Sequence, residues 1–361
     1  MRALRLLIVD DSAIARSVIA EIFRNSIAVK VVGFCTDGTQ VPKAIEDLQP
    51  DIITLDVEMP HLTGPSVLKH VLNKSSIPVI MVSGKTDKGA KITVECLSLG
   101  AIDFVLKPSA VYGQTIDTYA EQLLSKVTEI GQAALKRETL KSTTGSAIQR
   151  SEDFRKSGLA IIAIGASTGG PRAVASILSA LSRPCPPIVI AIHMPMPFTQ
   201  LFADRLDRMN KSSGSAIAVS QAHHRQKLVN NHAYLAPGDH HLTIDVNAEG
   251  VAVANLQPHL DNDIYKPSVD KLLHSVAKNF GSNALACILT GMGSDGLAGA
   301  RSIVKQGGTL FTQDEASSAI YGMPKVVNEA GLAHRCLSIN AFAAAIRELH
   351  LQHLNSHLVS S

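Results

Sequence analysis

Three short apolar runs in the second half of the chain each end close to a reactive side chain, and no other feature constrains the fold as strongly. Buried strands of a parallel sheet read as continuous apolar runs, and the crevice of an open α/β sheet lies outside the carboxyl ends of its strands. Side chains that follow such strands can converge, and a serine, a base and a carboxylate together suggest acyl transfer. The runs and the residues after them are 161–165 with Ser167, 188–192 with His193, and 286–289 with Asp295.

The length and composition allow two globular domains. The chain has 361 residues, of which 45% are hydrophobic, enough to fill two cores at the usual size of about 150 residues per domain. The net charge is only +3, aromatic residues make up 4%, and there is no Trp. This composition is poor for a surface that tracks phosphates or stacks on bases, so we expect no nucleic-acid partner.

The cysteines and the apolar segments favour a reducing compartment. The five cysteines are odd in number, widely scattered and form no Cys-x-x-Cys pair, so neither a disulfide framework nor a zinc site is indicated. The first apolar run, 6–9, is cut off by Asp10 and Asp11, which makes it too short for a signal peptide, and no later run approaches roughly 18 apolar residues. We expect a cytoplasmic protein that does not insert into a membrane.

Both halves alternate strand-like runs with amphipathic stretches, which predicts α/β domains with parallel sheets. Residues 1–125 form the first predicted domain. Residues 126–157 are interpreted as a helix end and a polar linker, and residues 158–361 as a second, doubly wound and mostly parallel domain, in which Pro171 opens a helix. The strand runs are 6–9, 29–33, 52–55, 79–82 and 104–106 in the first domain, and 161–165, 188–193, 232–236 and 286–289 in the second.

Four of the strand runs in the first domain end in residues suited to phosphoryl chemistry. Each residue alone has an ordinary explanation, because doubly wound folds often end strands in polar residues. Clustered carboxylates repel one another unless a divalent cation neutralises them, and hard oxygen ligands suit Mg²⁺. One aspartate could then act as a nucleophile toward a phosphoryl donor, while Mg²⁺ and a lysine offset charge and a serine hydrogen-bonds to the transferred group. The residues are Asp10 with Asp11, Asp56 as the nucleophile, Ser83 and Lys107.

This pattern resembles a response-regulator receiver domain with a flavodoxin-like fold, over residues 1–125. The resemblance implies that Asp56 is phosphorylated, that Asp10, Asp11 and Asp56 hold Mg²⁺, that Ser83 is the switch hydroxyl, and that Lys107 pairs with the phosphoryl group. It also implies a cis bond before Pro108. At 61–64 the sequence departs from the family pattern, which usually has an Asp before the glycine. The motifs that carry the resemblance are Asp10-Asp11-Ser12, Asp56-Val57-Glu58-Met59-Pro60, Ser83 and Lys107-Pro108.

The stretch around Ser167 has the Gly-x-Ser-x-Gly pattern of a nucleophile elbow, in which glycines let a sharp strand-to-helix turn expose the serine hydroxyl. A phosphate-binding P-loop is disfavoured because Pro171, not Lys, follows the last glycine, and the dinucleotide fingerprint is absent. His193 is then the candidate base and Asp295 the carboxylate that orients it. The chain order Ser, His, Asp differs from that of α/β-hydrolases, so a lipase-like topology is not expected.

Two further features bear on the second site. The loop 290–296 is dense in glycine, so it could aim backbone N–H groups at a developing oxyanion, although it could equally be an ordinary flexible loop. The histidine pairs 223–224 and 240–241 suggest metal binding, but adjacent residues on a strand point to opposite faces, which disfavours that interpretation.

The second half is similar to the catalytic domain of the chemotaxis protein-glutamate methylesterases. The resemblance implies Ser167 as nucleophile, His193 as general base and then acid, Asp295 as orienting carboxylate and Met292 as a backbone oxyanion donor. Departures from the family pattern, Ala191, Met196 and Leu297, flank the motifs. The motifs are 165–171 (GASTGGP), 193–195 (HMP), 236–238 (APG), 267–270 (PSVD), 289–296 (LTGMGSDG), 313–315 (QDE) and 321–324 (YGMP).

Together the two resemblances imply a phosphorylation-activated serine esterase that demethylates γ-glutamyl methyl esters of chemoreceptors and also deamidates receptor glutamines. They imply methyl-accepting receptors as substrates, a chemotaxis histidine kinase as phosphodonor, and no cofactor in the esterase site. We also expect the unphosphorylated receiver to cover the crevice at Ser167, and phosphorylation to open it. The alternatives are a non-catalytic response regulator whose output half binds a protein or nucleic acid, and a nucleotide-binding oxidoreductase.

Overall fold

The structure is a computed structural model that describes residues 2–59, 62–84, 86–108, 115–140, 159–215, 217–260 and 262–358. The chain divides into two compact units, Met1–Thr144 and Gly145–Ser361. This division falls inside the predicted linker 126–157, most of which lies outside the described residues, as does His61. Among the described helices, none is both long and apolar enough to cross a membrane.

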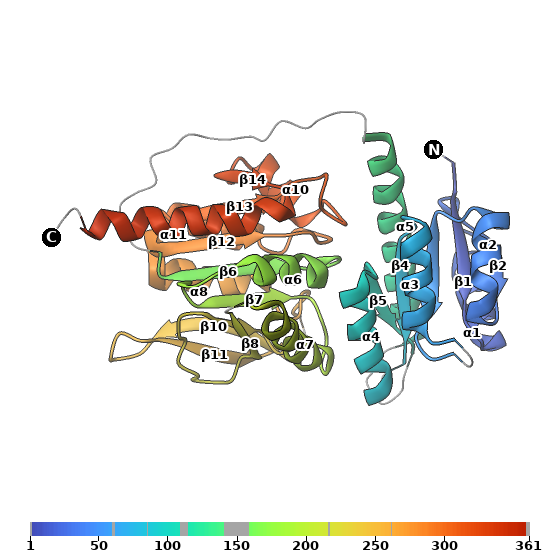
Figure 1. Ribbon diagram of the computed structural model, residues 1–361, viewed down its shortest axis with the longest axis horizontal. Coiled ribbons are helices and arrows are strands. Elements are labelled where there is room, and N and C mark those ends of the chain that lie inside the picture. The colour runs from blue at the N-terminus through green and yellow to red at the C-terminus, as the bar shows by residue number, and fades with distance from the viewer. Residues whose placement is uncertain are drawn as a thin grey trace. The chain divides into compact units, whose positions relative to one another are not determined.

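The N-terminal unit is a five-stranded parallel sheet with the strand order β2-β1-β3-β4-β5, the order of flavodoxin-like folds (Figure 1). Helices α1 and α5 contact each other on one face, and α2, α3 and α4 pack in sequence on the other. Two helices begin at side-chain caps, because Ser12 accepts from the N–H of Ala15 and Thr86 from that of Gly89. The elements are β1 Leu4–Val9, α1 Ala13–Phe23, β2 Val29–Cys35, α2 Val41–Leu48, β3 Ile52–Asp56, α3 Gly64–Lys74, β4 Val79–Ser83, α4 Asp87–Leu99, β5 Asp103–Leu106 and α5 Ile116–Leu140.

The C-terminal unit is built on a seven-stranded sheet, all parallel, with the order β14-β13-β12-β6-β7-β9-β8, beside an antiparallel hairpin of β10 and β11. Its central strands are apolar along their whole length and fully buried, as expected for a sheet covered on both faces. The strands are β6 Ile161–Ala166, β7 Ile188–Ile192, β8 Ala218–Gln221, β9 His232–Leu235, β10 His240–Val246, β11 Ala252–Pro258, β12 Ala284–Ile288, β13 Thr309–Gln313 and β14 Arg335–Leu337.

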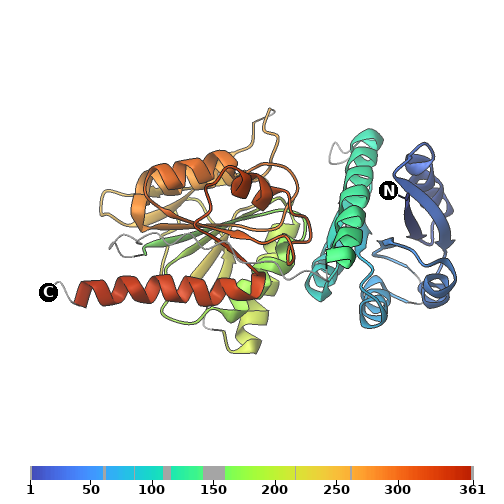
Figure 2. The ribbon, with the colours of Figure 1, turned by 90° about the horizontal axis from the view of Figure 1, so that it is seen from above.

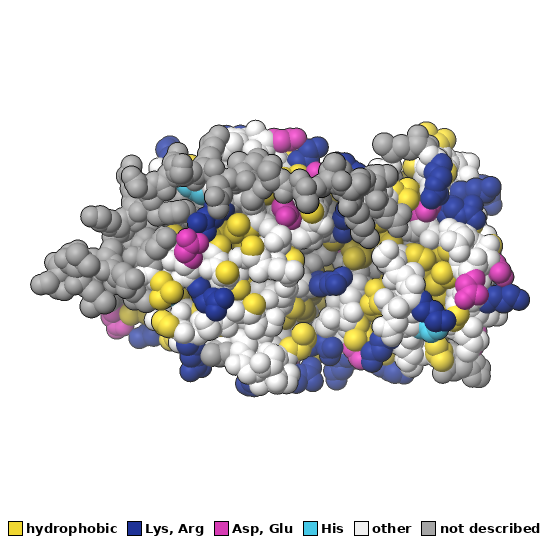
Figure 3. Space-filling view, turned by 45° about the horizontal axis from the view of Figure 1, so that its top comes forward, with side chains coloured by type: hydrophobic (Ala, Val, Ile, Leu, Met, Phe, Trp, Pro, Cys, Tyr) yellow, Lys and Arg dark blue, Asp and Glu magenta, His cyan; other side chains and the backbone are white. Residues whose placement is uncertain are grey.

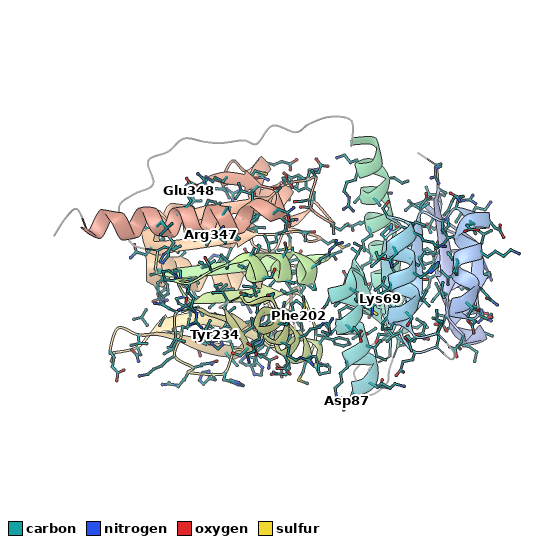
Figure 4. All side chains as sticks on the ribbon, viewed as in Figure 1. Lys69, Asp87, Phe202, Tyr234, Arg347 and Glu348 are labelled. Atoms are coloured by element: carbon teal, nitrogen blue, oxygen red, sulfur yellow. The ribbon has the colours of Figure 1, made fainter. Side chains whose placement is uncertain are left out.

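Helices cover both faces of this sheet. Figure 2 shows α8 and α9 on one face, and α6, α7 and α11 on the other. The large buried side chains include Phe202 of α7 and Tyr234 of β9, both labelled in Figure 4. The helices are α6 Gly170–Ala180, α7 Phe198–Ser213, α8 Val269–Phe280, α9 Leu297–Lys305, α10 Met323–Glu329 and α11 Phe342–Leu358.

The strand order changes direction at β6, whose neighbours are β12 and β7. Ligand sites in open α/β sheets lie at such switch points. At Gly165, β6 is in close contact with α8, because a Cβ on this residue would lie 2.2 Å from Val269 Cγ1. Since β12, β6 and β7 are neighbouring parallel strands and α8 contacts all three, their carboxyl ends lie together beside the start of α8.

The predicted strand runs all lie within observed strands or overlap them, and the predicted fold class is confirmed. Strands β8, β13 and β14 and the hairpin were not predicted, and Pro171 stands one residue inside its helix, which begins at Gly170. The expected cis bond before Pro108 was wrong: the cis bonds among the described residues precede Pro184, Pro197 and Pro267.

Candidate active site

Ser167 lies on a tight turn between β6 and α6. Gly169 adopts a positive φ of 77°, and the N–H of Gly170 donates to the carbonyl of Ser167 at 2.7 Å, which closes the turn. The N–H of Ser167 donates to the carbonyl of Thr290 at 3.0 Å, so the turn is tied to the loop after β12. A Cβ on Gly169 would lie 2.4 Å from that of Ala319. Only glycine meets both demands at this position.

His193 follows β7 and joins the other two predicted residues. Its Nδ1 lies 3.1 Å from Ser167 Oγ, and its Nε2 lies 2.8 Å from Asp295 Oδ2. Since a carboxylate can only accept, Nε2 carries the proton and Nδ1 is left to accept from the serine hydroxyl. The three side chains predicted from separate strand ends are therefore joined in one hydrogen-bonded chain.

Asp295 is 2% exposed and sits at the N-terminus of α8. Its carboxylate accepts from the N–H of Val269 at 2.7 Å, from the N–H of Asp270 at 2.9 Å and from Ser268 Oγ at 3.2 Å. Burial acts to raise the pKa of Asp295. The hydrogen bond from His193, the charge that its imidazole carries when protonated, and the hydrogen bonds of these two amides together outweigh burial, so the pKa lies below its ordinary value. The group stays ionised beside the imidazole.

The glycine-rich loop after β12 packs directly on the serine. A Cβ on Gly291 would lie 2.8 Å from Ser167 Cβ, and the N–H groups of Gly322 and Met323 both donate to the carbonyl of Gly291. Met292 therefore lies between Gly291, which touches the serine, and Gly293, which touches Tyr265.

Sequence reasoning missed three contributors to this site. Tyr265 stacks on His193, with ring centroids 5.0 Å apart and planes at 14°. Ser268 and Asp270 belong to the motif 267–270, but the sequence alone predicts no role for either. Ser268 caps α8 by accepting from the N–H of Lys271, and a Ser before an amphipathic run is a recognisable helix start. No local signal marks Tyr265.

In the N-terminal unit the predicted acidic residues also meet. Asp10, Asp11 and Asp56 bring carboxylate oxygens within 4.8 Å of one another, and Lys107 Nζ lies 2.9 Å from Asp10 Oδ2 and 3.0 Å from Asp56 Oδ1. Ser83, at the end of the neighbouring strand β4, donates to the carbonyl of Gly84 at 3.0 Å. It also accepts from Thr93 Oγ1 at 2.8 Å.

The electrostatics of this cluster suit a divalent cation. Burial, helped by repulsion from Asp10 and opposed by Lys107, raises the pKa of Asp56 to about 6. Burial alone would lower the pKa of Lys107, but the charges of Asp56 and Asp10 and its hydrogen bonds to them raise it above its ordinary value. Three carboxylates lie together and Lys107 pairs with Asp10 and Asp56. Hard oxygen donors with excess negative charge fit Mg²⁺.

A metal site needs several ligand atoms close together. Among the described residues, Asp10, Asp11 and Asp56 are the only group of three or more His, Cys, Asp or Glu residues whose ligand atoms lie within 4.8 Å of one another, and neither histidine pair belongs to it. His241 is fully buried and its two ring nitrogens are both used: Nε2 lies 2.6 Å from Asp263 Oδ2, and Nδ1 accepts from the N–H of Ser268 at 3.0 Å.

Comparisons with known proteins identify the families to which the two units are similar. Residues 162–346 match the family model of the CheB methylesterase, and residues 6–112 match the response regulator receiver domain. A protein-glutamate methylesterase/protein-glutamine glutaminase 2 of Pseudomonas aeruginosa is 36% identical over 94% of this chain and 95% of its own length. The corresponding protein of Bacillus subtilis is 36% identical over 95% of this chain and 97% of its own.

A solved structure extends the likeness to three dimensions. The crystal structure of the Thermotoga maritima CheB methylesterase catalytic domain is similar with a TM-score of 0.50 and 36% identity, and the match covers 54% of this chain and 99% of that domain. Since the sequence likeness runs through both units, this chain belongs to the CheB methylesterase family and carries a response regulator receiver domain ahead of the methylesterase domain.

Proposed function

We propose that this chain is a phosphorylation-activated protein-glutamate methylesterase of chemotaxis that also deamidates glutamine. The observation that carries the proposal is the continuous chain from Ser167 through His193 to Asp295 at the switch point of the sheet. The names of the relatives supply the substrate class, an esterified or amidated glutamate side chain in a protein.

In the proposed acylation step, His193 Nδ1 takes the proton of Ser167 as Oγ attacks the ester carbonyl. The N–H of Met292 stabilises the oxyanion of the tetrahedral intermediate, a contribution that is typically worth about 3 kcal/mol when such a donor is removed. The intermediate then collapses, its C–O bond to the methoxy group breaks, and methanol leaves with the proton from the imidazolium.

Deacylation repeats this proton path with water. His193 takes a proton from water as the water oxygen attacks the acyl carbon, and returns it to Ser167 Oγ when the acyl bond breaks. The products are a free glutamate side chain and the regenerated serine. A glutamine side chain passes through the same geometry and releases ammonia, which explains how one site supports both activities.

In the receiver, we propose that Asp56 is the phosphoryl acceptor. Asp10, Asp11 and Asp56 would hold Mg²⁺, which offsets the charge of the incoming phosphoryl oxygens. Lys107 lies 3.0 Å from the acceptor carboxylate and can pair with the phosphoryl group. Ser83 lies on the adjacent strand, and its hydroxyl can leave the carbonyl of Gly84 and the hydroxyl of Thr93 to hydrogen-bond to the phosphoryl group instead.

The partners follow from this assignment. Methyl-accepting receptors are the proposed substrates and a chemotaxis histidine kinase the proposed phosphodonor. We further propose that phosphorylation at Asp56 increases access to Ser167. A cytoplasmic location and the absence of a nucleic-acid partner stay predictions. On the face seen in Figure 3, Lys and Arg side chains of the described residues lie among acidic, hydrophobic and other side chains.

The test is methanol release from methylated receptor membranes, together with labelling of the serine by a fluorophosphonate and mapping by mass spectrometry. We expect Ser167→Ala to abolish both signals, and a phosphodonor to increase methanol release in the wild type. The matched control is Ser179→Ala, an exposed serine on α6 whose removal should change neither. Full methanol release by Ser167→Ala would refute the assignment of Ser167 as the nucleophile, and no release by the wild type would favour a non-catalytic output domain. Equal rates with and without phosphodonor would contradict control by phosphorylation.

A further inference from the structure

We propose that Tyr265 is a positioning residue for the His193 imidazole, held in place by a second histidine–aspartate pair, His241 with Asp263. The inference rests on the proposed function, because it assigns His193 the role of base. It adds a residue that touches the imidazole and not the reacting atoms.

The first observation is the stacking itself. The ring of Tyr265 lies nearly parallel to that of His193, with centroids 5.0 Å apart. The His193 side chain is 15% exposed, so the tyrosine covers a face of the imidazole that would otherwise meet water or be free to tilt. The imidazole is neutral before the serine attacks and cationic afterwards, and the face of an aromatic ring attracts a cation. The contact therefore becomes stronger as the transition state is approached.

The second observation concerns the far end of the tyrosine. A Cβ on Gly293 would lie 2.7 Å from Tyr265 Oη, so the hydroxyl end packs against the backbone of the loop that follows β12. Gly293 has a positive φ of 82° and precedes Asp295 by two residues. Tyr265 thus contacts both the base and the loop that carries its orienting carboxylate.

The third observation is the way in which the segment around Tyr265 is held. His241 bridges Asp263 and Ser268, which stand two residues before Tyr265 and three residues after it. Asp263 also accepts from Lys271 Nζ at 2.6 Å and from the N–H of Leu260 at 2.7 Å. Both ends of the segment are fixed by a histidine that is fully buried.

The next residues of the same stretch bind the carboxylate of Asp295. Ser268 Oγ donates to Asp295 Oδ1 at 3.2 Å, and the N–H groups of Val269 and Asp270 donate to the same carboxylate. Residues 263–270 therefore hold two members of the hydrogen-bonded chain at once: the ring of Tyr265 rests on His193, and the start of α8 binds Asp295.

The experiment compares Tyr265→Phe, which keeps the ring, with Tyr265→Leu, which removes it, in the full-length chain treated with a phosphodonor. We expect the Phe variant to label with a fluorophosphonate within about twofold of wild type, and the Leu variant to label about three- to tenfold more slowly, the range set by aromatic and cation–π contacts. Methanol release should show the same loss in kcat with little change in KM, because the ring acts on the imidazole and not on the substrate.

Ile264→Ala is the matched control, since Ile264 is the preceding residue and is 85% exposed. Tyr265→Met supplies a second non-aromatic variant in case Leu disturbs the loop, and circular dichroism checks that each variant melts near the wild type. Equal labelling of the wild type and both non-aromatic variants would overturn this inference alone. A Phe variant as slow as Leu would overturn it too, because the ring face would then not be the cause. Failure of the wild type to label at Ser167 would overturn the proposed function and this inference together.

Discussion

Replacing Asp295 by Asn tests whether the carboxylate sets the proton positions of the site. The two side chains have nearly the same shape, but an amide has only one accepting oxygen. In the structure both carboxylate oxygens face donors: Oδ2 accepts from His193 Nε2 and the N–H of Val269, and Oδ1 from the N–H of Asp270 and the hydroxyl of Ser268. Whichever way the amide turns, its NH₂ group meets a backbone N–H at the start of α8.

The size of the effect follows from these two orientations. With its NH₂ toward His193, the amide forces Nε2 to accept, so the imidazole proton moves to Nδ1 and the base can no longer take the proton of Ser167. With its oxygen toward His193, the tautomer survives but the negative charge that stabilises the imidazolium is lost. Removing the charge or the tautomer in a serine triad costs about 10⁴ in kcat, and we expect a loss of about 10³ to 10⁴ here. The unsatisfied backbone N–H should also lower the free energy of unfolding by about 1–3 kcal/mol.

The assay is methanol release by phosphodonor-treated enzyme, with the fluorophosphonate labelling rate as a measure that does not depend on receptor binding. Asp245→Asn, an exposed position on β10, is the matched control and should be neutral in both. If Asp295→Asn folds and keeps more than a tenth of the wild-type rate, Asp295 does not set the imidazole tautomer, and the reasoning is refuted.

Two further predictions concern charge and space. In Mg²⁺-free solution, Asp56→Asn should stabilise the N-terminal unit at pH 7. In the wild type, the folded state holds a proton on Asp56 up to a pKa of about 6, whereas the unfolded chain releases it near 3.8. The free energy of unfolding therefore falls as the pH rises through that window, by about 3 kcal/mol in total. Urea unfolding at pH 4 and pH 7 measures this, and a wild-type stability that is flat or rises between those values would contradict it. Gly291→Ala should lower the unfolding free energy by about 1–3 kcal/mol and slow fluorophosphonate labelling, because its Cβ would lie 2.4 Å from Met323 Sδ and 2.8 Å from Ser167 Cβ. Gly84→Ala is the control, because its Cβ would meet nothing within 4 Å. If Gly291→Ala keeps the wild-type unfolding free energy and labelling rate, the loop after β12 does not pack on Ser167 and Met323 as described.

The sheet and the three strand-end residues were predictable because they depend on local patterns. A fully buried parallel strand is apolar along its length, and its carboxyl end faces the crevice of the sheet. A run such as 161–165 therefore predicts both a strand and the position of the next polar residue, at the edge of that crevice. The edge strand β14 escaped prediction because it has only three residues, all half-buried, and carries neither pattern.

The support around the triad was not predictable in the same way, because it depends on tertiary contacts. Nothing near Tyr265 in the sequence indicates that it lies on His193, which stands 72 residues earlier. The pairing of His241 with Asp263 likewise requires that the hairpin lie beside the start of α8. The sequence already disfavoured a metal at the histidine pairs, but it could not show that the buried member, His241, is hydrogen-bonded to a carboxylate and a backbone N–H.

The two sites balance charge in different ways, and this difference fits their proposed roles. In the C-terminal unit the protein itself neutralises the carboxylate of Asp295, through two N–H groups of α8, a hydroxyl and the imidazole, so the site is organised before any substrate arrives. In the N-terminal unit three carboxylates lie together, one ammonium group pairs with Asp10 and Asp56, and burial raises the pKa of Asp56. Binding of a cation, or a change of charge at Asp56, relieves the repulsion among these carboxylates. A site whose energy depends on what binds to it is suited to sensing, whereas a site already balanced by its own fold is suited to catalysis.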